Sequence, residues 1–258
     1  MKEIFNITSL GLIFGMIGTT LGGIVGANIK VVSNKFLGFI LEFAAGLMTS
    51  IICFDLIPES LEIVSIGTCI FGILLGVISM IICDRYINKM NKKNSKYNSL
   101  LKTGIIIGIG LTIHNFPEGL AIGSGFEVSE ELGLSLAIAI AIHDFPEGIS
   151  MAVPMSKGGF SKIKAIILTA ISGITTGIGA LAGAIIGNIS VELIGISLAF
   201  AAGTMLYITS CELIPESNRL YKGRFASFGN MLGIILGIFV KALWNKLIAV
   251  EDAYIDQL

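Results

Sequence analysis

The chain has 258 residues, of which 54% are hydrophobic and 14% are charged, and its formal net charge at pH 7 is −1. This composition, with a mean hydropathy of +0.89, excludes an ordinary soluble domain, because such a domain needs far more polar surface to stay dispersed in water. Lipid is therefore expected to be the main solvent of the chain.

Long apolar stretches follow one another along the whole chain. A membrane-spanning helix needs about 20 mostly apolar residues, since the hydrocarbon core is about 30 Å thick. Eight stretches meet this requirement, approximately at 7–29, 36–57, 62–83, 101–124, 132–155, 164–187, 191–213 and 226–248. Their connections are short apart from the polar stretch 84–100, which leaves no room for a separate soluble domain. We therefore predict an all-α membrane protein with a single transmembrane domain over 1–258.

The positive charges indicate how these spans are oriented. The connections after spans one, three, five and seven hold 14 of the 17 Lys and Arg residues, whereas the opposite connections hold only acids such as Glu127, Glu130, Glu131 and Glu192. By the positive-inside rule, the basic side is cytoplasmic. We therefore predict a multi-pass protein of the cell membrane with both termini outside and with 84–100 as a cytoplasmic loop.

Two segments of the chain repeat each other. Residues 43–60 read FAAGLMTSIICFDLIPES and residues 200–217 read FAAGTMLYITSCELIPES, with 11 of 18 positions identical. The repeat relates spans one to three (1–83) to spans six to eight (164–250). Spans two and seven are an odd number of spans apart and cross in opposite directions, so the repeat is inverted. Inverted repeats are common in secondary transporters, which bind substrate near the midplane; a duplicated scaffold without a transport role is the alternative.

The two central spans (101–155) also repeat each other and complete a three-plus-two-plus-three arrangement. They read IHNFPEGLA at 113–121 and IHDFPEGIS at 142–150, and they hold both histidines of the chain. His and Glu four residues apart share one helix face, and the residue after each His can share that face. Two such helices facing each other would bring together His114, Asn115, Glu118, His143, Asp144 and Glu147.

This group of side chains needs a cation. Ionisable groups at mid-membrane cost at least about 2.5–3.5 kcal/mol each, and three carboxylates would repel one another. Neither span has a Lys or Arg near its motif, and a metal ion satisfies imidazoles and carboxylates together. We predict that these six residues bind zinc, ferrous iron, manganese or cobalt; Cu(I) is disfavoured because it prefers Cys and Met, which this group lacks. Buried histidines that are merely hydrogen-bonded are the structural alternative.

The prolines of the two motifs predict local irregularity. Pro117 and Pro146 remove the helical hydrogen bonds to the carbonyls of Ile113 and Ile142, so we expect kinks at these points. Membrane helices tolerate such breaks where the freed backbone groups line a polar cavity.

The repeated ends of spans two and seven place acids on both sides of the membrane. Asp55 and Glu59 are predicted to face outside, and Glu212 and Glu216 to face the cytoplasm. Acids at both mouths with a metal cluster between them predict a path for cations. The alternative is that these acids, near helix ends, are only solvated.

These motifs resemble those of the ZIP (Zrt/Irt-like) metal transporters, especially the short bacterial zinc-uptake kind, over essentially the whole chain. The resemblance implies import of zinc, or of iron, manganese, cobalt or cadmium, by alternating access. It also implies that the six motif residues hold the transported ion, often as a binuclear centre. It further implies a homodimer and an elevator-like movement. We expect neither an enzyme, nor a resident cofactor, nor a nucleic-acid partner.

The sequence departs from the family pattern in three places. Asp144 stands where many members have Asn, and Thr175 and Thr176 stand where many bacterial members carry a Glu that binds a second metal ion. The stretch 84–100 contains no His, so the metal-sensing loop of some relatives is missing. Whether one or two ions bind is left open.

Two other functions could use the same site. An intramembrane metallohydrolase could activate water at such a metal ion, although the duplicated motifs are symmetric and no H-E-x-x-H is present. A channel or an exporter is the other alternative, because a binding site does not record the direction of flux.

Overall fold

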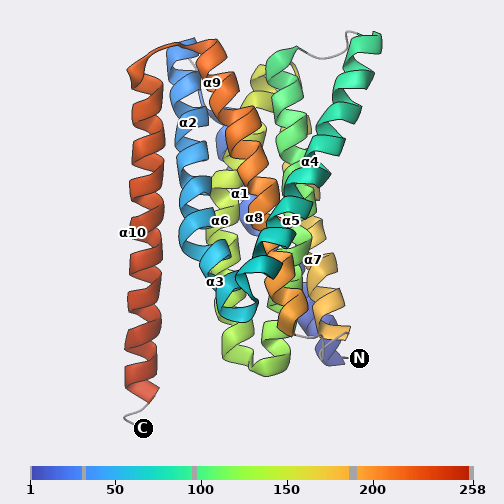
Figure 1. Ribbon diagram of the computed structural model, residues 1–258, viewed down its shortest axis with the longest axis vertical. Helices are drawn as coiled ribbons and strands as arrows, with labels where there is room; N and C mark the ends of the chain where they lie inside the picture. The colour runs from blue at the N-terminus through green and yellow to red at the C-terminus, as the bar shows by residue number, and fades with distance from the viewer. Residues whose placement is uncertain (1, 31–32, 95–97, 186–190, 256–258) are drawn as a thin grey trace.

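The structure is a computed structural model that describes residues 2–30, 33–94, 98–185 and 191–255, and these ranges form a bundle of helices (Figure 1). The helices are α1 (Lys2–Asn28), α2 (Asn34–Ile51), α3 (Ile57–Ile63), α4 (Ile66–Asn94), α5 (Ser99–Val128), α6 (Glu130–Lys157), α7 (Lys162–Ile185), α8 (Val191–Tyr207), α9 (Ile214–Leu220) and α10 (Arg224–Ile255). Two π-helical segments, η1 (Ile52–Leu56) and η2 (Ile208–Leu213), join α2 to α3 and α8 to α9.

Within the described ranges, eight spans are long and apolar enough to cross a membrane, which confirms the predicted all-α membrane fold. They are Ile4–Asn28, Asn34–Ile63, Ile66–Lys89, Ser99–Phe126, Gly133–Lys157, Lys162–Ile185, Glu192–Leu220 and Arg224–Ala242. Such helices suit lipid because every backbone hydrogen bond is made within the segment. The chain is a multi-pass membrane protein.

The polar stretch 84–100 differs from its prediction as a loop. Helix α4 continues to Asn94 and α5 begins at Ser99, while residues 95–97 lie outside the described part of the chain. The segment from 84 to 94 contains no Gly or Pro and is rich in Lys, which favours helix. Within it, the side-chain amide of Asn88 donates to Asp84 Oδ1, one helical turn away, at 2.7 Å.

The irregular backbone lies in different spans from those that the motif prolines indicated. Helices α5 and α6 run through Pro117 and Pro146 without a break. The α-helical pattern is interrupted instead at η1 and η2, just before Pro58 and Pro215. A proline lacks the N–H that would bond four residues back, and a π-turn is one way to absorb this loss. Sequence analysis missed both π-turns.

Helices α1, α5, α6 and α7 pack against one another, while α2 packs with α10 and α4 packs with α8. Two buried hydrogen bonds are reciprocal between the repeated segments. The Ser60 hydroxyl donates to the Gly195 carbonyl at 2.8 Å, and the Ser217 hydroxyl donates to the Gly38 carbonyl at 2.9 Å. The same sequence offset separates Ser60 from Ser217 and Gly38 from Gly195, so the two hydrogen bonds join equivalent positions of the repeated segments.

The two ends of the bundle differ in charge. The basic end carries Lys102, Lys157, Lys162 and Arg219, and the opposite end carries Glu62, Glu130 and Glu131. Buried apolar side chains fill the bundle between the basic end and its middle, including Ile107 and Leu111 of α5, Met151 of α6 and Ile208 of η2. The half of the bundle next to the basic end is therefore tightly packed.

Candidate metal site

The paired motifs lie at corresponding positions of α5 and α6. His114, Asn115 and Glu118 of α5 and Asp144 and Glu147 of α6 are each at most 1% exposed. The backbone of His143 lies in α6 beside Asp144, but its side chain lies outside the described part of the structure. The sequence motif therefore becomes a fully buried polar group within an apolar bundle.

His114 forms the direct contact between the two helices. Its Nε2 lies 3.0 Å from Glu147 Oε2 and 4.0 Å from Glu118 Oε1. Its Nδ1 lies 3.1 Å from the Gly110 carbonyl oxygen. Because a carbonyl oxygen can only accept, Nδ1 carries a hydrogen and donates it. This backbone contact is typical of metal-binding histidines, where it leaves the other ring nitrogen available to the ion.

The second residue of each motif turns toward a neighbouring helix. The Asn115 amide donates to the Ser172 carbonyl of α7 at 3.1 Å. Asp144 lies against α1 at Gly18, where an added methyl group would come within 2.6 Å of the Asp144 Cβ. Among the described side chains, His114 thus lies near both Glu118 and Glu147, while Asn115 and Asp144 also contact neighbouring helices.

Several buried oxygen atoms of this region have unused hydrogen-bonding capacity. Asn115 Oδ1, Glu147 Oε1 and Thr176 Oγ1 make no hydrogen bond to any described atom. Leaving such a group unsatisfied costs about 1–3 kcal/mol, and more when it is charged. Oxygen atoms of this kind can serve as ligands for a hard or borderline cation, so the residues present fit a metal ion as their partner.

The described side chains do not yet form a closed coordination shell. Among them, no three His, Cys, Asp or Glu residues are arranged to hold one ion. Two ligands of a tetrahedral zinc ion are about 3.3 Å apart, so the distances of 3.0 Å and 4.0 Å at His114 Nε2 are each within 1 Å of that spacing. Small side-chain movements would bring these three residues around one ion.

Thr175 and Thr176 lie on α7 beside this group. The Thr175 hydroxyl donates to the Ser172 carbonyl of its own helix at 2.6 Å. Thr176 is fully buried and is the residue that supplies the unsatisfied hydroxyl described above. A second bound ion would find a neutral hydroxyl here rather than a carboxylate.

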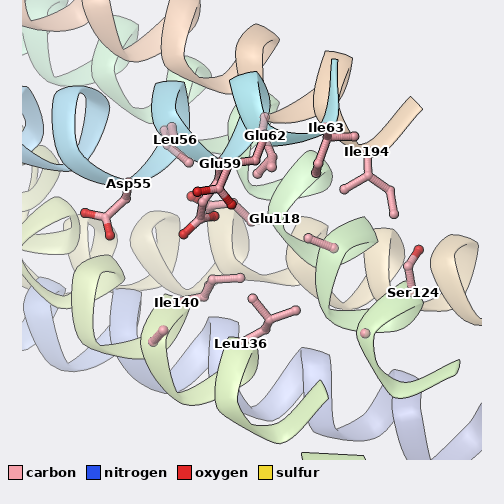
Figure 2. Close-up of a pocket in the computed structure, with 14 residues that line it drawn as sticks. Asp55, Leu56, Glu59, Glu62, Ile63, Glu118, Ser124, Leu136, Ile140 and Ile194 are labelled. Carbon is pink, nitrogen blue, oxygen red and sulfur yellow. The ribbon is translucent and has the colours of Figure 1, made fainter. Parts of the chain in front are cut away.

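A cavity of about 300 Å³ connects the buried motif to the acids of span two. Asp55 of η1 and Glu59 and Glu62 of α3 line it on one side, and Glu118 of α5 lines it on another. Figure 2 shows the Glu59 and Glu118 side chains extending into this space, with Asp55 to one side and Leu136 and Ile140 of α6 across from them. The predicted pathway acids Asp55 and Glu59 therefore share a cavity with a predicted metal ligand.

Sequence analysis missed two charged residues here, of which Glu62 lines the cavity and Lys241 contacts two of its acids. Glu62 follows Glu59 by three residues and Asp55 by seven, a spacing that places all three on one helix face. Lys241 of α10 lies with its Nζ 2.5 Å from Asp55 Oδ1 and 3.5 Å from Glu59 Oε1. Glu62 could have been found from its spacing, but Lys241 comes from a segment that is distant in the sequence.

The acids of span seven lie near the basic end and are buried. The Thr103 hydroxyl donates to Glu212 Oε2 at 3.2 Å. The Arg219 guanidinium donates to both oxygens of Glu216, at 2.8 Å and 2.7 Å, and the Ser99 hydroxyl donates to Glu216 Oε2 at 2.7 Å. Apolar packing separates these two acids from His114, so the site communicates more openly with the opposite end.

Comparisons with known proteins agree with this picture. The model of a family described as ZIP zinc transporter matches residues 88–245, which include both motifs. The zinc transporter ZupT of Corynebacterium aurimucosum is 31% identical over 246 residues, covering 88% of this chain and 92% of the relative. The ZupT of Escherichia coli O127:H6 is 34% identical over 227 residues, covering 84% and 88%. The zinc transporter GufA of Myxococcus xanthus is 39% identical over 145 residues, which is 56% of each chain.

Proposed function

Since the chain belongs to the ZIP family of zinc transporters, we propose that it carries divalent transition-metal ions, zinc foremost, into the cytoplasm through the site between α5 and α6. The observation that carries this proposal is the fully buried contact of His114 Nε2 with Glu147 at 3.0 Å. Glu118, whose Oε1 lies 4.0 Å from the same nitrogen of His114, lines a cavity whose other wall is acidic. An imidazole and several carboxylates in an apolar bundle form a ligand set for zinc, and iron, manganese, cobalt and cadmium are further candidates.

The path in our proposal runs from Asp55 and Glu59 to the buried site and then to Glu212 and Glu216. By the positive-inside rule we take the basic end as cytoplasmic, so the cavity at Glu118 opens to the outside. The packed residues Ile107, Leu111 and Ile208 would then close the inner half, as alternating access requires of an outward-facing state. The inverted repeat gives the reason to expect a second state, in which the inner half opens instead.

Uptake of zinc into proteoliposomes tests the function and the site together. We expect saturable uptake by the unchanged protein and its loss in both Glu118→Ala and His143→Ala, because each substitution removes a proposed ligand from the site. Glu131→Ala is the matched control, since Glu131 is an exposed acid on α6, and it should transport normally. Normal uptake by both ligand variants would show that the motif is structural. Zinc that binds without crossing would contradict transport.

Metal affinity should fall as pH is lowered. Binding needs a neutral imidazole and ionised carboxylates, because a proton and the metal ion compete for the same lone pairs. We expect a loss of about tenfold in affinity per pH unit for each proton released, measured by zinc titration between about pH 8 and pH 6. An affinity that does not change over this range would contradict the assignment of His114 as a ligand.

A further inference from the structure

Lys241 places a positive charge on the acids of the outer cavity. It lies near the end of the apolar span Arg224–Ala242, and its side chain is 25% exposed. It reaches from α10, which lies at the edge of the bundle (Figure 1), to Asp55 of η1 and Glu59 of α3. A partly buried lysine in an apolar span is stabilised by counter-charges, and these two carboxylates provide them.

The same two carboxylates line the cavity that leads to Glu118. They cannot satisfy the ammonium group and a divalent ion fully at the same time, because like charges a few ångströms apart repel strongly away from bulk water. The ion pair therefore competes with any cation that enters the cavity.

The pair at the other acidic mouth is built differently. Arg219 binds Glu216 from the same helix, three residues away, and its side chain is 56% exposed. Lys241, in contrast, connects two helices that are far apart in the sequence. Its release would both expose the carboxylates and remove a link between α10 and the segment Ile52–Ile63.

We propose that Lys241 is a tethered cation that occupies the carboxylates of Asp55 and Glu59 and that an incoming metal ion displaces. This inference rests on the proposed transport function. It assigns Lys241 as a residue that sets the apparent affinity of the protein for the transported metal ion. Transport needs a first contact that attracts the ion yet releases it, and competition by Lys241 keeps this contact weak. The ion then passes on to the buried site at Glu118, Glu147 and His114.

Kinetics of zinc uptake test the competition. Lys241→Gln removes the charge and should lower KM about threefold to fivefold, the upper part of the range expected of a partly exposed ion pair, while kcat stays equal or falls. Lys241→Arg keeps the charge and should stay within about twofold of the unchanged protein in KM. In an Asp55→Asn background, the effect of Lys241→Gln should shrink. A KM that is unchanged or raised in Lys241→Gln would overturn the inference while leaving the transport function intact.

A second measurement does not depend on transport. Reductive methylation of lysines in nanodiscs, followed by mass spectrometry, reports how available each amine is. Zinc should speed methylation of Lys241 severalfold and leave that of Lys35, an exposed lysine on α2 near the basic end, unchanged. The response should persist in Glu118→Ala, because it arises at the outer acids. Equal or slower methylation of Lys241 with zinc would overturn the proposal.

Discussion

Glu147→Gln should lower zinc affinity at least about a hundredfold while leaving the metal-free fold as stable as before or more so. Glutamine has the shape of glutamate, and its amide can donate to His114 Nε2, which lies 3.0 Å from Glu147 Oε2. The variant therefore keeps the contact between α5 and α6. It also removes a buried negative charge, whose desolvation costs several kcal/mol. The metal, however, loses an anionic ligand and meets amide hydrogens instead.

Thermal unfolding with and without zinc measures both effects. A ligand at a hundredfold excess over its Kd stabilises the folded state by about 2.7 kcal/mol, so zinc should raise the melting temperature of the unchanged protein but not that of Glu147→Gln. Glu192→Gln, an exposed acid near the start of α8, is the control and should respond to zinc normally. Zinc stabilisation of Glu147→Gln would exclude Glu147 as a ligand. A large loss of metal-free stability would instead make the carboxylate a structural partner of His114.

The paired motifs could be predicted because their information is local. Residues at i and i+4 share a helix face in any helix, so the H-x-x-x-E spacing already placed His114 beside Glu118. The duplication placed a second such face at Glu147, and the structure joins the two faces through His114. Eight spans followed equally directly from the length of apolar stretches, because the thickness of the bilayer fixes that length.

What sequence analysis missed depends on contacts between distant segments. Lys241 lies 186 residues after Asp55, and no local pattern indicates that α10 packs beside α2. The π-turns at η1 and η2 were missed for another reason. A proline predicts a lost hydrogen bond, but only packing decides whether the helix bends, continues or adds a π-turn. Helices α5 and α6 continue through Pro117 and Pro146, whereas Pro58 and Pro215 follow π-turns.

Gly119→Ala should separate α5 from α7 and disrupt the site without touching a ligand. A Cβ at this position would overlap the carbonyl oxygen of Thr176 and would lie 2.7 Å from its carbonyl carbon and 2.9 Å from the Ala180 nitrogen. All three atoms belong to the backbone of α7, so no side chain can rotate to make room. We expect a loss of about 1–3 kcal/mol in stability from this overpacking. Zinc affinity should fall about 10–100-fold, because Glu118 is the preceding residue and its position depends on this contact.

Gly67→Ala is the matched control for this substitution. Gly67 lies in the first turn of α4, where the nearest atom to an added Cβ is Ser65 Oγ at 3.9 Å. Alanine is the better helix former by about 0.5–1 kcal/mol, so this variant should be as stable as the unchanged protein, or slightly more, and should bind zinc equally well. Thermal unfolding and zinc titration in detergent compare the two variants directly. If Gly119→Ala behaves like Gly67→Ala in both measurements, the backbones of α5 and α7 are not in contact beside Glu118, and the spacing of the site must be set by the contact of α5 with α6 alone.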